Sequence, residues 1–279
     1  MLNLPTKVLP TNMLNTIKRS RPVYAAGRKL RFAIGSRLGA REIPGIGSRA
    51  HFNDFMLTSA NPKLVAEYVA GARQFVGILE RSLNEAGKDW RDVDACLEVG
   101  CGYGRIIREL RHKLHPSKIY AADVIDEGAR FAASEFGVNN IPVLENTGDK
   151  YDGKFDLIYL LSVYTHLRRD MIETNLKQVA KALKPGGVVV FSTHGQGSAD
   201  TAERYDQYWL DKDKMLRSLA RDGYFYERYP YYYDEYGLTW MTSTATKNLV
   251  AHVTPELEFV VHTPMDVDDH QDTFVYRKR

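Results

Sequence analysis

The amino-acid sequence predicts an α/β domain of three layers, in which helices cover both faces of a mostly parallel sheet. From Asp94 onward, short apolar runs alternate with segments of helical periodicity. Strands that alternate with helices are joined by crossover connections, and these bury a parallel sheet on both faces. The hydrophobic content of 44% is that of an ordinary globular chain. Length and composition therefore predict one large domain with appendages.

The predicted strands of this sheet are short and apolar. They cover residues 95–99, 119–122, 142–144, 155–161 and 188–191. Two further runs, 257–261 and 273–276, are joined by residues 265–272 and predict a closing hairpin.

The helices carry start and stop signals. Asn61 and Pro62 supply an N-cap and a first-turn proline for an amphipathic helix. Asp126 and Gly137 predict the cap and the end of a helix over 127–136. The sequence Lys184-Pro185-Gly186-Gly187 ends another helix. The apolar positions of the first helix are Leu64, Val65, Tyr68, Val69, Phe75, Val76, Leu79 and Leu83.

The composition favours a soluble, cytoplasmic protein. No apolar run approaches the roughly 18 residues that span a bilayer. Pro5, Lys7 and Pro10 interrupt the apolar segment that a secretory signal would need. The only cysteines, Cys96 and Cys101, lie five positions apart across a predicted strand end, which suits neither a disulfide framework nor a zinc site.

The first 50 residues are strongly basic. They hold ten lysines or arginines and one acid, Glu42, so this segment carries +9 (10 − 1) and the remainder −6 (3 − 9). Such a segment could meet an anionic membrane surface, a nucleic acid or an acidic substrate, and it could equally be a solvated leader. We assign residues 1–58 to a basic, helical N-terminal extension and residues 59–279 to the main domain. If this extension binds an anionic membrane, we expect a cytoplasmic protein that attaches peripherally to the inner face of that membrane.

A glycine-rich turn follows the first strand of the predicted sheet. The sequence Glu98-Val99-Gly100-Cys101-Gly102-Tyr103-Gly104 ends that strand, and a helix opens at Ile106. Glycines there let the backbone turn sharply and approach a ligand. The third glycine comes one residue too early for a dinucleotide-binding pattern, which weakens an NAD interpretation. Asp123 ends the second strand 23 positions (123 − 100) after Gly100, near the offset at which a carboxylate meets ribose hydroxyls.

Four motifs in this order resemble those of class I methyltransferases, which use S-adenosylmethionine. They are Glu98-x-Gly100-x-Gly102-x-Gly104, Asp123, Phe155-Asp156-Leu157-Ile158 and Leu183-Lys184-Pro185-Gly186-Gly187. The resemblance covers residues 60–279 and implies a seven-stranded sheet with an antiparallel last strand. Residues 162–167 and the terminal His270-Gln271-Asp272 are also similar to bacterial methyltransferases that modify small molecules and saccharides.

The resemblance implies roles in binding S-adenosylmethionine. The loop from Gly100 to Gly104, with Cys101 and Gly102, would hold the methionine portion, and Glu98 would order that loop or reach the amino group. Asp123 would take the ribose hydroxyls, and Val124 would pack on adenine. Asn146 and Thr147 follow the third strand, where family members hold the adenine amino group, although the family's Gly-Asp pair comes later here, at Gly148-Asp149. The expected cofactor site also includes Leu161 and Ser162.

Two histidines are candidates for a general base. A base is useful if the acceptor is a hydroxyl, and histidine titrates closest to neutral pH. His166 follows the fourth strand and His194 the fifth, so both lie at the carboxyl edge, where ligands bind in open α/β sheets. We predict His166 as the base, His194 as the second candidate and Tyr164 as a residue that orients the acceptor. Each of the three could instead be structural.

Aromatic side chains concentrate in an insertion over residues 198–250 that we expect to roof the acceptor pocket. They are Tyr205, Tyr208, Trp209, Phe225, Tyr226, Tyr229, Tyr231, Tyr232, Tyr233, Tyr236 and Trp240. Such rings could stack on a sugar, or they could pack a lid or a subunit interface.

Several acids are expected to be structural. Asp156 belongs at the start of its strand, away from the predicted pocket. The acids and the histidine of the closing hairpin could be imagined as metal ligands, but we expect a solvated turn and no metal site. These residues are Asp266, Asp268, Asp269, His270 and Asp272.

The hypothesis that fits these observations is an O-methyltransferase acting on a saccharide or a glycosylated small molecule. An RNA methyltransferase is the main alternative, because a basic segment and aromatic rings could hold phosphates and stack a flipped base. However, the fourth strand leads into Leu161-Ser162-Val163-Tyr164, not the Asn-Pro-Pro-Tyr of amino-methylating enzymes, so a nucleic-acid partner is not expected. A non-catalytic cofactor-binding module and an NAD-dependent oxidoreductase are further alternatives, and the number of subunits stays open.

Overall fold

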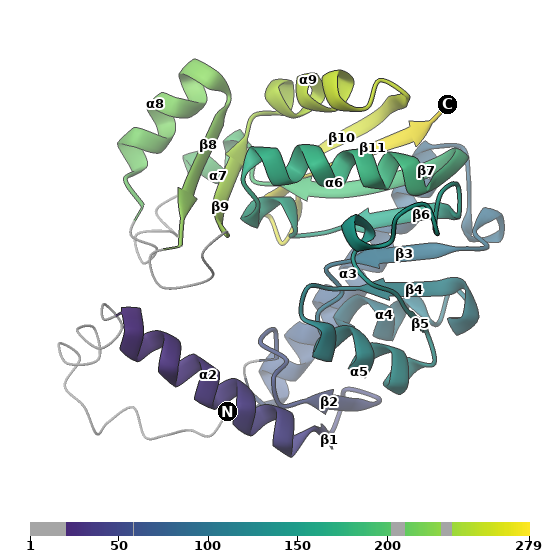
Figure 1. Cartoon of the computed structure of the whole chain (residues 1–279), viewed down its shortest axis with the longest axis vertical. Helices are drawn as coiled ribbons and strands as arrows, with labels where there is room; N and C mark the ends of the chain where they lie inside the picture. Colours follow the sequence, from purple (N-terminus) through teal and green to yellow (C-terminus); the bar gives the residue numbers. More distant parts are fainter. Residues whose placement is uncertain (1–20, 58, 202–209, 230–235) are drawn as a thin grey trace.

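The computed structural model describes residues 21–57, 59–201, 210–229 and 236–279. Its centre is a seven-stranded sheet with the order β10-β11-β7-β6-β3-β4-β5. The strands from β3 to β7 pair in parallel, and β11 pairs antiparallel with both β7 and β10. The predicted fold class, a mostly parallel Rossmann-like sheet with an antiparallel end, is thus confirmed (Figure 1).

The strands of this sheet have the following bounds. They are β3 (Cys96–Val99), β4 (Ile119–Ala122), β5 (Asn139–Asn140), β6 (Phe155–Leu160), β7 (Leu183–Thr193), β10 (Leu257–Val267) and β11 (Gln271–Lys278).

Helices cover both faces of the sheet, because successive strand residues alternate between two hydrophobic cores. On one face, strand residues such as Leu157 and Val190 pack with α3 (Pro62–Glu85), α4 (Arg105–Leu110) and α5 (Asp126–Phe136). On the other face, residues such as Ile158 and Phe191 pack with α6 (Arg169–Ala182) and α9 (Ser243–Val253).

Helix α3 begins where its cap predicts. The Asn61 side chain accepts a hydrogen bond from Lys63 N at 2.9 Å, and Pro62 occupies the first turn. The predicted apolar positions are buried except Leu64, which is 36% exposed. In α5, Asp126 is the first helical residue and not the cap, and Gly137 ends the helix at φ 70°.

The third predicted strand is wrong in position. Residues 142–144 are not a strand, and Asn139–Asn140 pair with β4 instead. Pro142 has no N–H to donate to a ladder, and the chain turns at once into a 3₁₀ helix, Leu144–Asn146. The closing hairpin is longer than predicted, because its turn contains only three residues, Asp268, Asp269 and His270. Asp268 and Asp269 have φ of 52° and 50°, and three-residue loops of this kind are common in hairpins.

Two peripheral units lie beside the main sheet. Helix α2 (Arg21–Leu38) leads into a small hairpin of β1 (Ala40–Glu42) and β2 (Arg49–His51). Between β7 and α9 lie α7 (Gln196–Asp200), α8 (Lys212–Asp222), β8 (Tyr224–Arg228) and β9 (Gly237–Met241). These elements share a small core of their own, which we call the lid core. Short 3₁₀ helices cover Trp90–Asp92, Pro116–Lys118 and Tyr164–His166.

Both peripheral units flank the carboxyl ends of the parallel strands, where α2 lies on one side of that edge and the β8–β9 pair on the other (Figure 1). Within the predicted insertion 198–250, α9 packs on the main sheet through Leu249 and Val250. The division of the chain at residues 58 and 59 stays a prediction. None of the helices in the described ranges is both long and apolar enough to cross a bilayer.

Candidate active site

The glycine loop between β3 and α4 is held in a conformation that favours glycine. Gly100, Gly102 and Gly104 have φ of 80°, 52° and 78°. A Cβ on Gly100 would lie 2.6 Å from Val163 Cγ2, and one on Gly104 would lie 2.6 Å from Phe136 Cε2. A Cβ on Gly102 would meet none of the described atoms within 4 Å, so the loop is tightly packed at its ends and open at its middle.

Asp123 lies directly against this loop. Its Oδ2 accepts a hydrogen bond from Gly102 N at 2.7 Å, and its Oδ1 accepts one from Ile125 N at 2.7 Å. Burial raises the pKa of Asp123, and the two backbone N–H groups oppose that rise. The sequence placed these residues on adjacent strand ends, and the structure brings them into contact. Each carboxylate oxygen retains a further lone pair with which to accept from a ligand hydroxyl.

Glu98 lies beneath the loop in a buried position. Its Oε2 accepts a hydrogen bond from the Tyr159 hydroxyl at 2.8 Å. Burial, with a smaller contribution from the Asp123 charge, raises the pKa of Glu98 to about 8. Glu98 therefore carries a proton at neutral pH in the ligand-free chain.

Other predicted cofactor residues fall into different environments. Val124 is 68% exposed, an unusual position for an aliphatic side chain and one that suits packing against a flat ring. Asn146 is exposed, and the Thr147 hydroxyl donates to Leu144 O at 2.8 Å. Asp149 is exposed and forms an ion pair with Lys181.

Cys101 contributes only its backbone to the loop. Its side chain is buried in the core beneath α3, and burial raises the pKa of its thiol. The side chain of Cys101 thus faces the core, and the place of this residue in the cofactor-binding loop stays a prediction.

A polar network marks the end of β6. Ser162 has φ 60°, an uncommon conformation for a non-glycine residue. Its backbone N–H donates to Ser192 Oγ at 2.7 Å, and its hydroxyl lies 2.9 Å from Gln271 Nε2. Ser192 Oγ in turn donates to Gln271 Oε1 at 2.7 Å. Leu161, the neighbouring residue, is buried at 8% exposure. Strained residues at a sheet edge are often found at functional sites.

His166 lies at this edge and contacts the β8–β9 pair. Its Nδ1 is 2.7 Å from the Tyr229 hydroxyl and 3.3 Å from Gly237 O. A carbonyl can only accept, so this contact favours the tautomer with the proton on Nδ1 and the lone pair on Nε2. Burial lowers the pKa of His166, which keeps the ring neutral at pH 7.

His194 is more deeply placed than His166. It is 4% exposed, its Nδ1 donates to Thr239 O at 2.9 Å, and its ring stacks on Trp240 at 4.8 Å. Burial lowers the pKa of His194 well below its ordinary value. Its backbone also accepts from Met241 N at 2.9 Å. His194 thus attaches β9 to the end of β7, a structural role that weakens its candidacy as a base.

The structure places the Tyr164 side chain in the core, and its role as a residue that orients the acceptor stays a prediction. The side chain is completely buried and packs on Phe191 with ring centroids 5.1 Å apart. Its hydroxyl donates to Asn175 Oδ1 of α6 at 2.9 Å, and so points into the core. Tyr164 begins the 3₁₀ helix after β6, and this short helix directs its side chain into the core that α6 and α9 cover.

The aromatic insertion also differs in part from the prediction. Phe225 and Trp240 are buried in the lid core and cannot stack on a sugar. The Trp240 Nε1 donates to Ser198 Oγ at 3.2 Å. Tyr226, Tyr229 and Tyr236 are partly exposed. The remaining predicted aromatics lie outside the described residues; they are Tyr205, Tyr208, Trp209, Tyr231, Tyr232 and Tyr233.

Two acids of the closing hairpin, Asp266 and Asp272, have protein partners. Asp266 accepts from Arg81 Nη2 at 2.6 Å and from the Thr273 hydroxyl at 2.7 Å. Asp272 is buried and contacts His262 Nε2 at 2.8 Å. Asp156 accepts from Ala95 N and Lys184 Nζ at the opposite end of the sheet, as its predicted structural role requires.

Gly128 is a residue of this site that the sequence did not indicate. It lies in the first turn of α5, and a Cβ there would come within 2.5 Å of Gly102 O and 2.9 Å of Gly102 C. The helix can pack against the glycine loop only because this residue has no side chain. An isolated glycine early in a helix was the one available signal.

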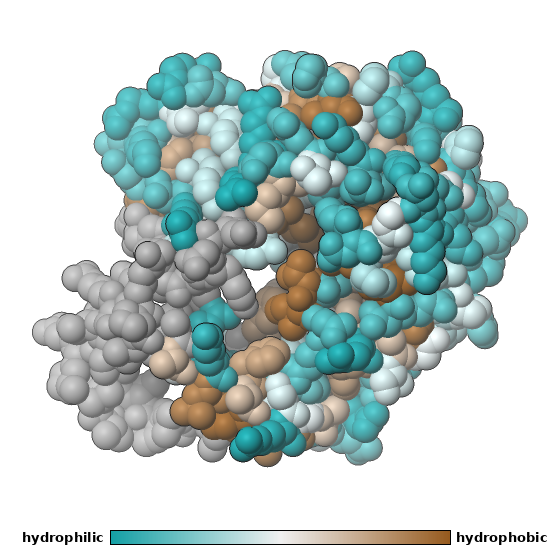
Figure 2. All heavy atoms as spheres, in the orientation of Figure 1, coloured by the Kyte–Doolittle hydropathy of each residue, from teal (hydrophilic) through white to brown (hydrophobic). Residues whose placement is uncertain are grey.

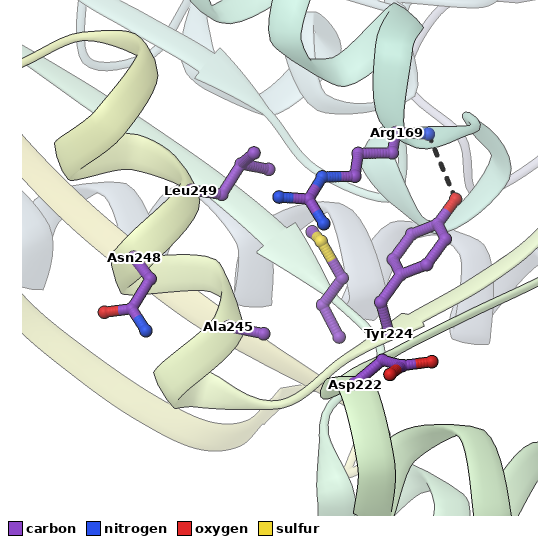
Figure 3. Close-up of a pocket in the computed structure, with 7 residues that line it drawn as sticks. Arg169, Asp222, Tyr224, Ala245, Asn248 and Leu249 are labelled. Carbon is purple, nitrogen blue, oxygen red and sulfur yellow. Dashed lines mark hydrogen bonds between the residues drawn. The ribbon is translucent and has the colours of Figure 1, made fainter.

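The face at the carboxyl edge is hollowed, and hydrophobic side chains are visible along the hollow (Figure 2). A separate pocket lies between the start of α6, the α8–β8 turn and α9. Its lining includes Arg169, Asp222, Tyr224 and Leu249, and Arg169 N donates to the Tyr224 hydroxyl at 3.0 Å (Figure 3). None of the residues predicted to bind the cofactor lines it.

Known proteins share this architecture and its motifs. The model of a family described as a methyltransferase domain matches residues 70–245. The chain belongs to this family and is a methyl-transferring enzyme, as the sequence motifs predicted. Over 108 residues it is 30% identical to a malonyl-[acyl-carrier protein] O-methyltransferase of Priestia megaterium. That match covers 37% of this chain and 38% of the relative, so the chain aligns with well under half of that protein.

Solved structures show the same fold. The PH0226 protein from Pyrococcus horikoshii OT3 superposes with a TM-score of 0.55 at 14% identity, over 76% of this chain and 92% of that protein. The magnesium protoporphyrin IX methyltransferase from Synechocystis PCC 6803, solved with bound SAH, superposes with a TM-score of 0.51 at 12% identity, over 78% and 88% of the two chains. At such identities these likenesses concern the fold alone.

Proposed function

We propose that this methyltransferase transfers the methyl group of S-adenosylmethionine to a hydroxyl oxygen of a saccharide or a glycosylated small molecule, with His166 as the general base. S-adenosylmethionine is the methyl donor, in keeping with the family and with the SAH-bound structural neighbour. When bound, it supplies an electrophilic methyl group on a sulfonium, and the acceptor oxygen displaces a neutral thioether.

The residues at the ends of β3 and β4 suit this donor. The open middle of the glycine loop, at Gly102, leaves room for the methionine portion. Asp123 is held at the edge with free lone pairs for two ribose hydroxyls. Val124 presents an exposed aliphatic surface for the adenine ring. Glu98, protonated when the site is empty, would ionise beside a ligand ammonium group and so bind it by charge.

The contact between His166 and Tyr229 is the observation that carries the proposed base. Tyr229 comes from the segment after β8, and the His166 ring comes from the end of β6, so the pair joins the lid elements to the sheet. The Gly237 carbonyl favours a neutral ring with a basic Nε2, which is the form that can accept a proton from a hydroxyl. Positioning of the acceptor oxygen would supply most of the remaining rate.

An oxygen acceptor is favoured by two observations. The relative from Priestia megaterium is named as an O-methyltransferase. In this chain, the network of Ser162, Ser192 and Gln271 places hydroxyl and amide groups at the same edge as His166. Ser162, the partly exposed member of this network, can bind a sugar hydroxyl by donating to it or accepting from it, and the buried Ser192 and Gln271 hold Ser162 in place. The choice of a saccharide as the acceptor rests on this network and on three partly exposed tyrosines, Tyr226, Tyr229 and Tyr236.

A panel of acceptors with isotopically labelled S-adenosylmethionine tests the acceptor class. Methyl mass on mono- or oligosaccharides, with none on RNA, is expected. Incorporation into malonyl-acyl carrier protein and not into sugars would replace the saccharide by a carboxylate acceptor. Incorporation into RNA would revive the nucleic-acid alternative. Binding of SAH with no incorporation into any acceptor would favour a non-catalytic module.

Substitution of the histidine tests the base. His166→Gln is expected to lower kcat by about 10²–10⁴-fold, the usual contribution of a general base, while the affinity for SAH changes less than about twofold. His252→Gln is the matched control, because His252 is an exposed histidine at the end of α9. Equal turnover in the two variants would remove His166 from the base role without affecting the assignment of the donor.

A further inference from the structure

We infer that α2 is a membrane-docking helix that binds the surface of an anionic lipid bilayer. The proposal concerns where the enzyme works, and it does not depend on the identity of the acceptor. Its basis is the distribution of exposed apolar and cationic side chains on this one helix.

One face of α2 exposes an aliphatic stripe. Leu30, Ile34 and Leu38 follow one another at intervals of four residues, and they are 63%, 40% and 51% exposed. Residues four apart lie on the same face of a helix. Most large apolar side chains of the described chain are buried, so a continuous exposed stripe marks a surface that meets another phase or partner. Hydrophobic side chains gather over α2 in the space-filling view (Figure 2).

A different face of α2 attaches the helix to the domain. Gly35 is buried, and Asn53 Nδ2 donates to Phe32 O at 3.0 Å and to Ser36 Oγ at 3.1 Å. Asn53 Nδ2 also lies 3.0 Å from Glu127 Oε2 of α5. These bonds hold α2 at the edge of the molecule with the stripe exposed, and the helix extends past the carboxyl edge of the sheet (Figure 1).

The charges around the stripe select its partner. The 18 residues of α2 include five arginines or lysines and no aspartate or glutamate. Lys29, Arg31 and Arg37 are exposed. Arg31 directly follows Leu30 in the chain, and Arg37 directly precedes Leu38. Anionic lipid headgroups attract such cations, while the aliphatic stripe can enter the boundary of the acyl chains. The helix is thus built to lie on a bilayer.

Other partners fit this surface less well. Two copies of α2 packed face to face would bring ten cations (2 × 5) together with no acid on either helix. A nucleic acid would use the cations but would leave the aliphatic stripe in water. An anionic bilayer satisfies both features at once, and it would bring the adjacent carboxyl edge close to acceptors at the membrane surface.

Vesicle sedimentation of the full chain tests the proposal. The chain is expected to bind phosphatidylcholine vesicles that contain about 30% phosphatidylglycerol, and to bind pure phosphatidylcholine at least about tenfold more weakly. Binding should weaken when the salt concentration rises from about 0.1 M to about 0.5 M. Equal binding to both vesicles, or none to either, would overturn the proposal, as would binding to RNA without binding to vesicles.

Variants separate the stripe from the charges. The triple variant Leu30→Ser, Ile34→Ser and Leu38→Ser should lose at least about tenfold in partitioning, because three aliphatic side chains no longer enter the lipid. Arg31→Glu should lose about fivefold or more. Phe259→Ser and Lys177→Glu are the matched controls, because both side chains are exposed and lie on the main domain. SAH binding should stay unchanged in all of these variants, which shows that they fold. Equal partitioning of the stripe variant and its control would refute a docking role for α2.

Discussion

Gly128→Ala is a sharp test of how the cofactor site is built, because two effects of this substitution oppose each other. Within a helix, alanine is favoured over glycine by roughly 0.5–1 kcal/mol. Gly128 lies inside α5, and its φ is not positive, so the substitution by itself should stabilise the chain. Any net loss must therefore come from the contact with the glycine loop.

That contact is severe. The new Cβ would lie 2.5 Å from Gly102 O and 2.9 Å from Gly102 C, whereas non-bonded carbon atoms rest about 3.5–4.0 Å apart. The loop cannot yield freely, because Gly102 N is bonded to Asp123 at 2.7 Å. Overpacking of this kind costs about 1–3 kcal/mol, so the net loss of stability should be roughly 0.5–2 kcal/mol after the helix preference is subtracted. At about 2–4 °C for each kcal/mol, Tm should fall by about 1–8 °C.

Calorimetric titration with SAH and thermal unfolding measure both consequences. A loop displaced at Gly102 should bind SAH at least about tenfold more weakly, which corresponds to about 1.4 kcal/mol. Gly77→Ala in α3 is the control, because a Cβ there would meet only Arg81 Nη1 at 3.9 Å. This control should raise Tm slightly and leave SAH affinity unchanged. If Gly128→Ala behaved like the control, the close packing of α5 on the glycine loop would not be what shapes the site.

Three further predictions concern titration and burial. Burial raises the pKa of Glu98 from 4.5 to about 8, so the folded state binds this proton more tightly than the unfolded state does. The contribution of Glu98 to stability should therefore be full below pH 4.5 and be lost as pH rises from 4.5 to about 8, so thermal unfolding of Glu98→Gln should lack this decline over that window; an unchanged profile would mean that Glu98 is ionised at neutral pH. Burial lowers the pKa of His166 below 6.5, so kcat/KM should be level at neutral pH and fall only in more acidic solution, and a fall centred above pH 7 would contradict a neutral buried base. Tyr164→Phe leaves the buried Asn175 amide without its donor, so denaturant unfolding should show a loss of about 1–3 kcal/mol, whereas kcat should be unchanged; a large fall in kcat with intact stability would return Tyr164 to the acceptor site.

The parts of the site that the sequence predicted are local ones. The glycines after β3 and the acid after β4 lie at strand ends, and adjacent parallel strands bring their carboxyl ends to one edge. The spacing of the motifs along the chain is therefore enough to place Asp123 beside Gly102. The sheet could also be predicted from local pattern. The period of the apolar residues indicates which side chains are buried, and so distinguishes strands from helices.

The misplaced third strand shows where local reasoning reached its limit. An apolar run at 142–144 was a plausible strand by composition, but pairing with β4 is made by Asn139–Asn140, which no hydrophobic pattern marks. A two-residue strand at the edge of a sheet is defined by its partner and not by its own sequence. The direction of the Tyr164 side chain could not be predicted for a related reason, because the end of a strand does not fix which side of the sheet the next side chains enter.

The sequence by itself determined the order of the main strands and helices, the glycine loop and the acid beside it, because backbone torsions and hydrophobic period act over a few residues. Only the tertiary structure decided which side chains from distant segments meet. Tyr229 contacts His166 across 63 positions, Gly128 makes room for Gly102, and His194 bonds to β9 across 45 positions. These contacts depend on how whole elements pack, and packing is a property of surfaces that are far apart in the chain.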